Sequence, residues 1–287
     1  MRAVGQAART AVEGGAAWVD TAPNYGDGRA HASLAPVLAE YPQVHVATKT
    51  GVVAPAQRWS AVAQGVLSER QAAAGHSLDA GFVRWQTRRS VHDLGRADVV
   101  FVHNPERSSP QRPWVHARLR EAFTVLEEFA DRGLIGGYGV ATWSGFENGL
   151  FTVSDLVAFA RQAAGGDGHH LVAVQMPVSL VMDTAIRAAL AGRGPLAEAH
   201  DVGLLTFASA PLHGGELPHL VTPELAALIR PGLSPAAACL AAVASTPYLD
   251  VVLLSASTSE HWATARDAVA LPLERRRLQE ITDVLAA

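Results

Sequence analysis

Residues 17–28 read Ala17-Trp18-Val19-Asp20-Thr21-Ala22-Pro23-Asn24-Tyr25-Gly26-Asp27-Gly28. A short apolar run ends at Asp20, and proline, asparagine and glycine follow it, which is typical of a buried strand that enters a tight loop. This pattern predicts that Asp20 and Tyr25 lie at the carboxyl end of a strand. In barrel and open α/β folds, that end carries the chemistry. Taken alone, the pattern fits a loop-capping aspartate and a packed tyrosine equally well.

Further apolar runs have the length of strands and alternate with segments of helical character, and a helix is predicted over residues 1–14, before the first strand. This alternation predicts an α/β fold, a (β/α)8 TIM-type barrel. Because such a barrel normally begins with a strand, we expect its first strand to be lacking or modified. With no linker or low-complexity tract, residues 1–287 are expected to form a single domain. The predicted strands are 16–22, 44–50, 98–103, 137–142, 171–176, 203–208 and 251–256.

Composition excludes several classes of protein. A formal net charge of −4 and a scattered arrangement of arginines argue against a nucleic-acid partner. No run approaches the ~18 apolar residues of a membrane-spanning helix, and the N-terminus lacks a signal sequence, so no membrane partner and a cytoplasmic location are expected. The single cysteine, Cys239, allows no internal disulfide and is expected to be buried. No Cys/His cluster has the spacing of metal ligands, so no metal is predicted.

Lys49 is the only lysine in the chain, and apart from histidine every other basic residue is arginine. Arginine cannot replace lysine where a compact amine is needed, so the retained ammonium indicates a functional role. Lys49 and His103 fall at the ends of the second and third predicted strands. Since strand ends converge on one mouth of a barrel, we expect Asp20, Tyr25, Lys49 and His103 to be neighbours.

These four side chains have a chemical logic as a group. A phenol has a reference pKa of about 10 and is a poor acid at neutral pH. An ammonium beside a phenol favours the phenolate, and a carboxylate keeps that ammonium charged. A histidine can orient a carbonyl or share the proton. The pattern therefore predicts an acid/base centre.

The segments Asp20-Thr21-Ala22 with Tyr25-Gly26, Ala47-Thr48-Lys49 and Val102-His103-Asn104-Pro105 resemble the signature segments of the aldo-keto reductases. The resemblance covers nearly the whole chain. It implies a barrel enzyme that moves a hydride between a nicotinamide cofactor, usually NADPH, and the carbonyl of a small organic molecule. It further implies that Tyr25 is the general acid, that Lys49 tunes it, that Asp20 holds Lys49 and that His103 orients the carbonyl oxygen.

The sequence departs from the family pattern on the cofactor side. The fourth strand usually ends Gly-Val-Ser-Asn in the family, but here it reads Gly139-Val140-Ala141-Thr142. Ser209 stands where an aromatic residue usually stacks on the nicotinamide, and Thr258 stands where a basic residue usually grips the adenosine 2′-phosphate. The resemblance implies six cofactor-binding residues: Thr142, Gln175, Ser209, Leu212, Ser257 and Thr258.

Three enzymatic functions stay open at this point, beside a non-catalytic binding role in which the barrel is a scaffold, and the oligomeric state stays open as well. The first is NADPH-dependent reduction of a carbonyl. The second is acid/base chemistry without a hydride, as in a lyase, cyclase or isomerase that no longer uses NADPH, because several cofactor contacts are altered. The third is a Schiff-base aldolase, since a strand-end lysine such as Lys49 can act as a nucleophile.

Overall fold

The computed structural model describes residues 2–256 and 258–286. Contacts along the backbone divide the chain into two compact units, Met1–Val174 and Gln175–Ala287. The strand β5 (Leu171–Pro177) begins in the first unit and ends in the second. The single domain expected over residues 1–287 therefore stays a prediction.

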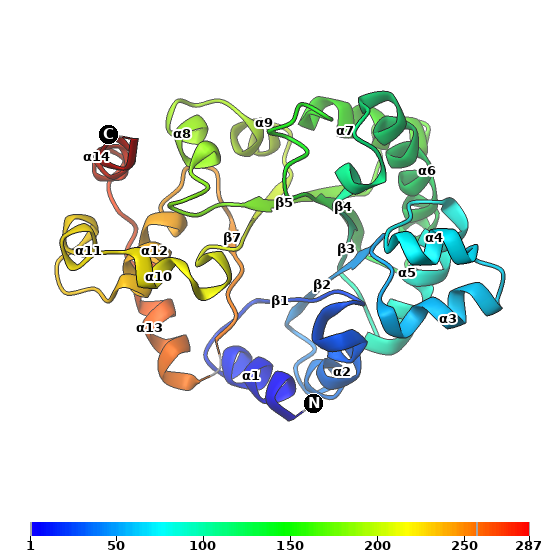
Figure 1. Cartoon of the computed structure of the whole chain (residues 1–287), viewed down its shortest axis with the longest axis horizontal. Coiled ribbons are helices and arrows are strands. Elements are labelled where there is room, and N and C mark those ends of the chain that lie inside the picture. Colours follow the sequence, from blue (N-terminus) through cyan, green and yellow to red (C-terminus); the bar gives the residue numbers. More distant parts are fainter. Residues whose placement is uncertain (1, 257, 287) are drawn as a thin grey trace. The chain divides into compact units, whose positions relative to one another are not determined.

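Four strands of the first unit pair in parallel, each with the next one along the chain (Figure 1). Their core residues are buried on both faces, which explains why the strands appear in the sequence as continuous apolar runs. In the register of these pairs, Asp20 lies opposite Ala47 and His103 lies opposite Ala141. The four strands are β1 (Trp18–Asp20), β2 (His45–Thr50), β3 (Val99–His103) and β4 (Gly137–Ala141).

Helices of the first unit cover these strands with amphipathic faces. Val12, Val19, Leu38, Val46 and Leu94 form one core cluster that joins helices and strands from the start of the chain. The helix predicted over residues 1–14 is the first of them. The helices are α1 (Arg2–Glu13), α2 (Ala30–Glu40), α3 (Pro55–Ala63), α4 (Glu69–Ala74), α5 (Ala80–Leu94), α6 (Arg112–Asp131) and α7 (Val153–Ala164), with short 3₁₀ helices η1 (Tyr25–Gly28) and η2 (Pro105–Ser108).

The second unit contains two further strands, β6 (Leu205–Ser209) and β7 (Val251–Val252), which also pair in parallel. Cys239 is fully buried as expected, and burial raises the pKa of its thiol to about 11. The helices are α8 (Thr184–Leu190), α9 (Pro195–Asp201), α10 (Leu217–Leu220), α11 (Pro223–Ile229), α12 (Pro235–Ala244), α13 (Ser259–Val269) and α14 (Arg275–Ala286), with the 3₁₀ helix η3 (His213–Gly215).

Each of the seven predicted strands is present in the described part of the chain, and α1 precedes the first of them. The predicted α/β fold with parallel strands is therefore confirmed. None of the helices between residues 2 and 286, residue 257 aside, combines the length and the apolar character that crossing a bilayer requires.

Gly139 in β4 is a position where the sheet tolerates no side chain. A Cβ at this position would collide with the backbone oxygen of Ala173 and with the ring of Phe101. Displacing the backbone of a paired strand would break its hydrogen bonds, so the close approach of the neighbouring backbone explains why residue 139 is a glycine. Gly168, by contrast, has no atom near the position that a Cβ would occupy.

We therefore expect Gly139→Ala to lower the free energy of unfolding by about 3 kcal/mol, because the added methyl group overpacks the sheet. The matched control Gly168→Ala is expected to change it by no more than about 0.5 kcal/mol. Urea unfolding followed by circular dichroism measures both values. Equal stabilities of the two variants would contradict the close packing at β4.

Candidate active site

Lys49 and Asp20 form a buried ion pair at the ends of β2 and β1. The Lys49 side chain is 1% exposed, and its Nζ donates to Asp20 Oδ2 at 2.5 Å and to the carbonyl oxygen of Thr21 at 3.2 Å. Asp20 lies opposite Ala47, and Lys49 projects from β2 on the same face as Ala47 because strand side chains alternate. The parallel register therefore brings the ammonium to the carboxylate.

Burial acts against the charged form of Lys49, but the Asp20 carboxylate and the neighbouring Tyr25 outweigh it, so the pKa of Lys49 is raised. The amine is thus held as an ammonium. A buried ammonium is tolerated only when it is paired and hydrogen-bonded, and Asp20 and Thr21 meet that requirement.

Tyr25 lies beside this ammonium at the start of η1. Lys49 Nζ is 5.0 Å from the centroid of the Tyr25 ring, and Tyr25 is 39% exposed. The loop turns sharply after Tyr25, since Gly26 and Asp27 both have positive φ angles, 56° and 54°. The phenol is therefore held next to a buried cation while remaining accessible from solvent.

His103 ends β3, with its ring centroid 6.4 Å from that of Tyr25 and nearly perpendicular to it. Burial, and after it the charges of Lys49, His76 and Arg107, lowers the pKa of His103 to about 3. The imidazole is therefore neutral at physiological pH. Its buried Nδ1 has no hydrogen-bond partner in the described part of the chain. The structure thus brings all four predicted residues together in the first unit.

His76 is a residue of this site that the sequence did not reveal. Its Nε2 lies 2.9 Å from the backbone oxygen of His103, and an antiparallel bridge between Val52 and His76 holds it there. Gly51 lies against this contact, and a Cβ at residue 51 would approach His76 Nε2 to 3.3 Å. Its φ of 120° is also a conformation that favours glycine. A single histidine in a loop gives no signal in the sequence, because its role depends on tertiary placement.

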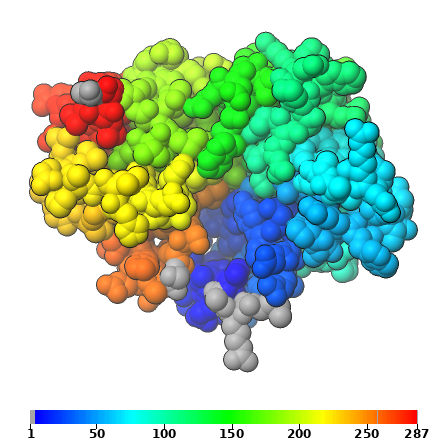
Figure 2. Space-filling view, viewed as in Figure 1, coloured from blue at the N-terminus to red at the C-terminus, as the bar shows by residue number. Residues whose placement is uncertain are grey.

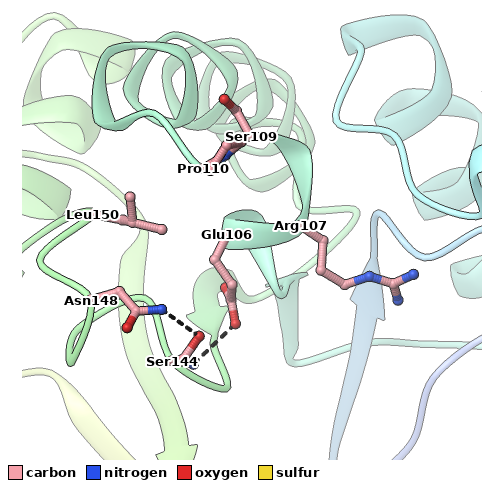
Figure 3. Close-up of a pocket in the computed structure, with 7 residues that line it drawn as sticks. All are labelled: Glu106, Arg107, Ser109, Pro110, Ser144, Asn148 and Leu150. Atoms are coloured by element: carbon pink, nitrogen blue, oxygen red, sulfur yellow. Dashed lines mark hydrogen bonds between the residues drawn. The ribbon is translucent and has the colours of Figure 1, made fainter.

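Thr142 follows β4, and its hydroxyl is already engaged. Thr142 Oγ1 donates to Glu106 Oε2 at 2.9 Å and accepts from the Gly145 N–H at 2.8 Å. Glu106 Oε1 also accepts from the backbone N–H groups of Trp143 and Ser144. Glu106, which the sequence did not single out, thereby ties the loop after β3 to the loop after β4. The two loops border a pocket of about 400 Å³, lined by Glu106, Arg107, Ser109, Pro110, Ser144, Asn148 and Leu150 (Figure 3).

The remaining predicted cofactor residues belong to the second unit. Gln175 is buried in β5, and Ser209 ends β6, with its carbonyl oxygen accepting from the Val178 N–H. Leu212 packs against the cluster between α12 and α13. Thr258 caps α13 by accepting from the His261 N–H at 3.1 Å. Ser257 lies outside the described residues.

The chemistry of these donors fits a dinucleotide phosphate. A helix N-terminus such as that of α13 offers backbone N–H groups and a positive dipole end to an anion. Gln175 supplies a buried amide, and Ser209 supplies a hydroxyl at the end of a strand. Arg266 on α13 forms an ion pair with Asp267, with 3.1 Å between Arg266 Nη2 and Asp267 Oδ1. The cofactor-binding roles of the six residues stay predictions.

Another polar cluster lies near the start of β4 and β5. Ligand atoms of Glu127, Asp131 and His170 lie within 4.8 Å of one another, the one such group in the described part of the chain, although the sequence predicted no metal. Glu127 is buried, and it accepts from the Tyr138 hydroxyl at 2.6 Å and from the His170 N–H at 3.0 Å. Protein donors thus satisfy this carboxylate.

Asp20→Asn is expected to lower the free energy of unfolding by about 3–5 kcal/mol, because it leaves the Lys49 ammonium buried without its counter-ion. The double variant Asp20→Asn/Lys49→Met removes both charges and is expected to lose less than the two single variants together. Urea unfolding of all four proteins gives the coupling energy. Additive losses would show that the pair is not coupled.

Comparisons with known proteins identify the family and the fold of the chain. The model of the Aldo/keto reductase family matches residues 2–286. No curated protein shows a significant match. Among solved structures, a glycerol dehydrogenase from Gluconobacter oxydans is 19% identical with a TM-score of 0.70, over 98% of this chain and 84% of that chain. An aldo-keto reductase from Klebsiella pneumoniae in complex with NADPH is 18% identical with a TM-score of 0.68, over 99% of this chain and 84% of that chain.

The likeness to these solved structures shows the fold, which is the (β/α) barrel type predicted from the sequence. The family match covers nearly every residue, including the strand ends that carry Asp20, Tyr25, Lys49 and His103. The chain therefore belongs to the aldo/keto reductase family.

Proposed function

We propose that the protein reduces the carbonyl group of a small organic molecule with NADPH, and that Tyr25 is the general acid. The observation that supports this most strongly is the buried Lys49–Asp20 pair, whose ammonium lies 5.0 Å from the ring centroid of the accessible Tyr25. A phenol placed between solvent and a permanent cation is suited to give up a proton to a substrate oxygen.

In this mechanism the Tyr25 hydroxyl donates its proton to the carbonyl oxygen as negative charge develops there. The Lys49 ammonium stabilises the phenolate that remains, since an adjacent opposite charge favours the ionised form. Asp20 keeps that ammonium charged and fixes its position through the 2.5 Å contact. The contacts of Lys49 with Asp20 and Tyr25 also disfavour the aldolase alternative, because a lysine that forms a Schiff base has to be a free, unprotonated amine.

His103 orients the substrate in this mechanism. Burial and the cations around it lower the pKa of His103 to about 3, so the ring is neutral. There is then no imidazolium that could donate a proton to the substrate. A neutral ring N–H can donate a hydrogen bond to the carbonyl oxygen and polarise it. Tyr25 and His103 would then hold the same oxygen from two sides, consistent with the 6.4 Å between their rings.

Bound NADPH would supply the hydride that the carbonyl carbon accepts. The resemblance assigns Thr142, Gln175 and Ser209 to the nicotinamide end, and Leu212, Ser257 and Thr258 to the rest of the cofactor. The capped N-terminus of α13 is suited to a phosphate group. Trp143, which follows β4 and is 47% exposed, is suited to contact an apolar part of the substrate.

One observation favours a second candidate, acid/base chemistry without a hydride. The Thr142 hydroxyl makes two hydrogen bonds inside the protein, to Glu106 and from Gly145, and Ala141 beside it has no polar group. Neither Ala141 nor Thr142 therefore offers a free side-chain donor to a nicotinamide carboxamide. Binding of NADPH distinguishes the two functions.

We expect NADPH to bind with one-to-one stoichiometry in a fluorescence or calorimetric titration. Tyr25→Phe is the matched control, because it keeps every predicted cofactor residue and is expected to bind NADPH with the affinity of the unaltered protein. No detectable binding at millimolar NADPH would contradict the reductase and favour a lyase, cyclase or isomerase.

Tyr25→Phe is also expected to slow turnover of an aromatic aldehyde by at least about 100-fold, because the variant has no proton to donate. The consumption of NADPH measures turnover, and circular dichroism shows whether the fold is kept. We expect the fold to be kept, because the tyrosine is partly exposed and the aromatic ring remains. A near-normal rate would remove Tyr25 from the mechanism.

A further inference from the structure

Two arginines from different segments of the first unit converge above Gly75. The position that a Cβ would take on Gly75 lies 3.7 Å from Arg58 Nη2 and 4.0 Å from Arg107 Nη2. Arg58 belongs to α3, and Arg107 belongs to η2. Gly75 follows the last residue of α4 and has a φ of 73°, a conformation that favours glycine, so residue 75 places no side chain of its own beside the two guanidinium groups.

Neither guanidinium has a counter-ion among the residues that the structure describes. Among residues 2–256 and 258–286, no ion pair or hydrogen bond of the Arg58 or Arg107 side chain is present, whereas Arg84 and Arg118 pair with carboxylates at 2.6 and 2.7 Å. Two like charges held close together repel each other, and a shared anion would relieve that repulsion. The planar donor fork of arginine matches a carboxylate in particular.

Glu106, the acidic residue next to Arg107, is engaged elsewhere. Its carboxylate accepts from Thr142, Trp143 and Ser144. Figure 3 shows the Arg107 side chain extending away from Glu106, and Figure 2 shows the α3–α4 segment, light blue to cyan, on the surface of the molecule. Arg58 and Arg107 are both exposed, and no carboxylate of the described residues pairs with either of them.

The pair lies beside the proposed catalytic residues. Gly75 directly precedes His76, whose ring contacts the backbone oxygen of His103 at 2.9 Å. Arg107 follows His103 closely in the chain, and its positive charge helps to lower the pKa of both His103 and His76, after burial as the main cause. An anion on the two arginines would thus sit near the ring that is proposed to orient the carbonyl.

We propose that Arg58 and Arg107 bind the carboxylate of the substrate, so that the protein prefers oxo acids, aldehydes or ketones that also carry a carboxylate. This inference rests on the proposed reduction, because it names the substrate class of the same site. It makes the two arginines specificity-determining residues, separate from the proton-transfer groups.

The test compares 4-carboxybenzaldehyde with its neutral methyl ester, which carries the same aldehyde. For the unaltered protein we expect kcat/KM to favour the acid by at least about 10-fold, since charge-assisted bonds to two arginines are involved. The double variant Arg58→Gln/Arg107→Gln should bring that ratio close to one. Arg88→Gln, an exposed arginine on α5, is the matched control and should keep the ratio. An unaltered protein without preference, or a double variant that keeps it, would overturn the proposal.

Calorimetric titration with the same two probes separates this inference from the proposed reduction. We expect the acid to bind at least about 10-fold more tightly than the ester, and the difference to disappear in the double variant and to shrink with added salt. If neither aldehyde consumes NADPH but the acid still binds through the arginines, the proposed reduction fails and the anion site stands. If both probes bind equally, the anion site fails whatever the turnover.

Discussion

The ion pair between Lys49 and Asp20 is the constraint on which the site depends. A fully buried ammonium is stable only with its carboxylate in contact, and the parallel register of β1 and β2 provides that contact. Placement of the charge is therefore a property of the sheet, not of a flexible loop. Tyr25 and His103 then take their electrostatic environment from a cation that cannot move away or lose its proton easily.

The charged and titratable side chains around this pair differ in how they are neutralised. Lys49 is neutralised by Asp20, and His103 is kept neutral by burial and by the cations near it. Arg58 and Arg107 keep their charges exposed beside it. In the functions proposed above, proton transfer and recognition of charge would rest on different side chains, so that one could change in evolution without the other.

Much of the fold could be predicted because its signals are local. Apolar runs gave all seven strands, although β1 and β7 are shorter than the runs at 16–22 and 251–256, since strand pairing covers only part of each run. The only lysine and the strand-end histidine indicated two of the side chains that the structure brings together in the candidate site. His76, Glu106 and the Arg58–Arg107 pair could not be foreseen, because each depends on which loops meet in space. The predicted roles of Gln175, Ser209, Leu212 and Thr258 depend in the same way on tertiary placement.

Glu106 shows how such a loop contact shapes the molecule. One carboxylate accepts hydrogen bonds from a side chain and two backbone groups of the neighbouring loop, so two loops that follow different strands share a single anchor. Side chains carried by these loops, such as Arg107 and Trp143, can then be exchanged while the backbone beneath them stays fixed. The exposed side chains of these two loops can therefore vary with little effect on the backbone. Substitution of Glu106 itself would remove the hydrogen bonds that join the two loops.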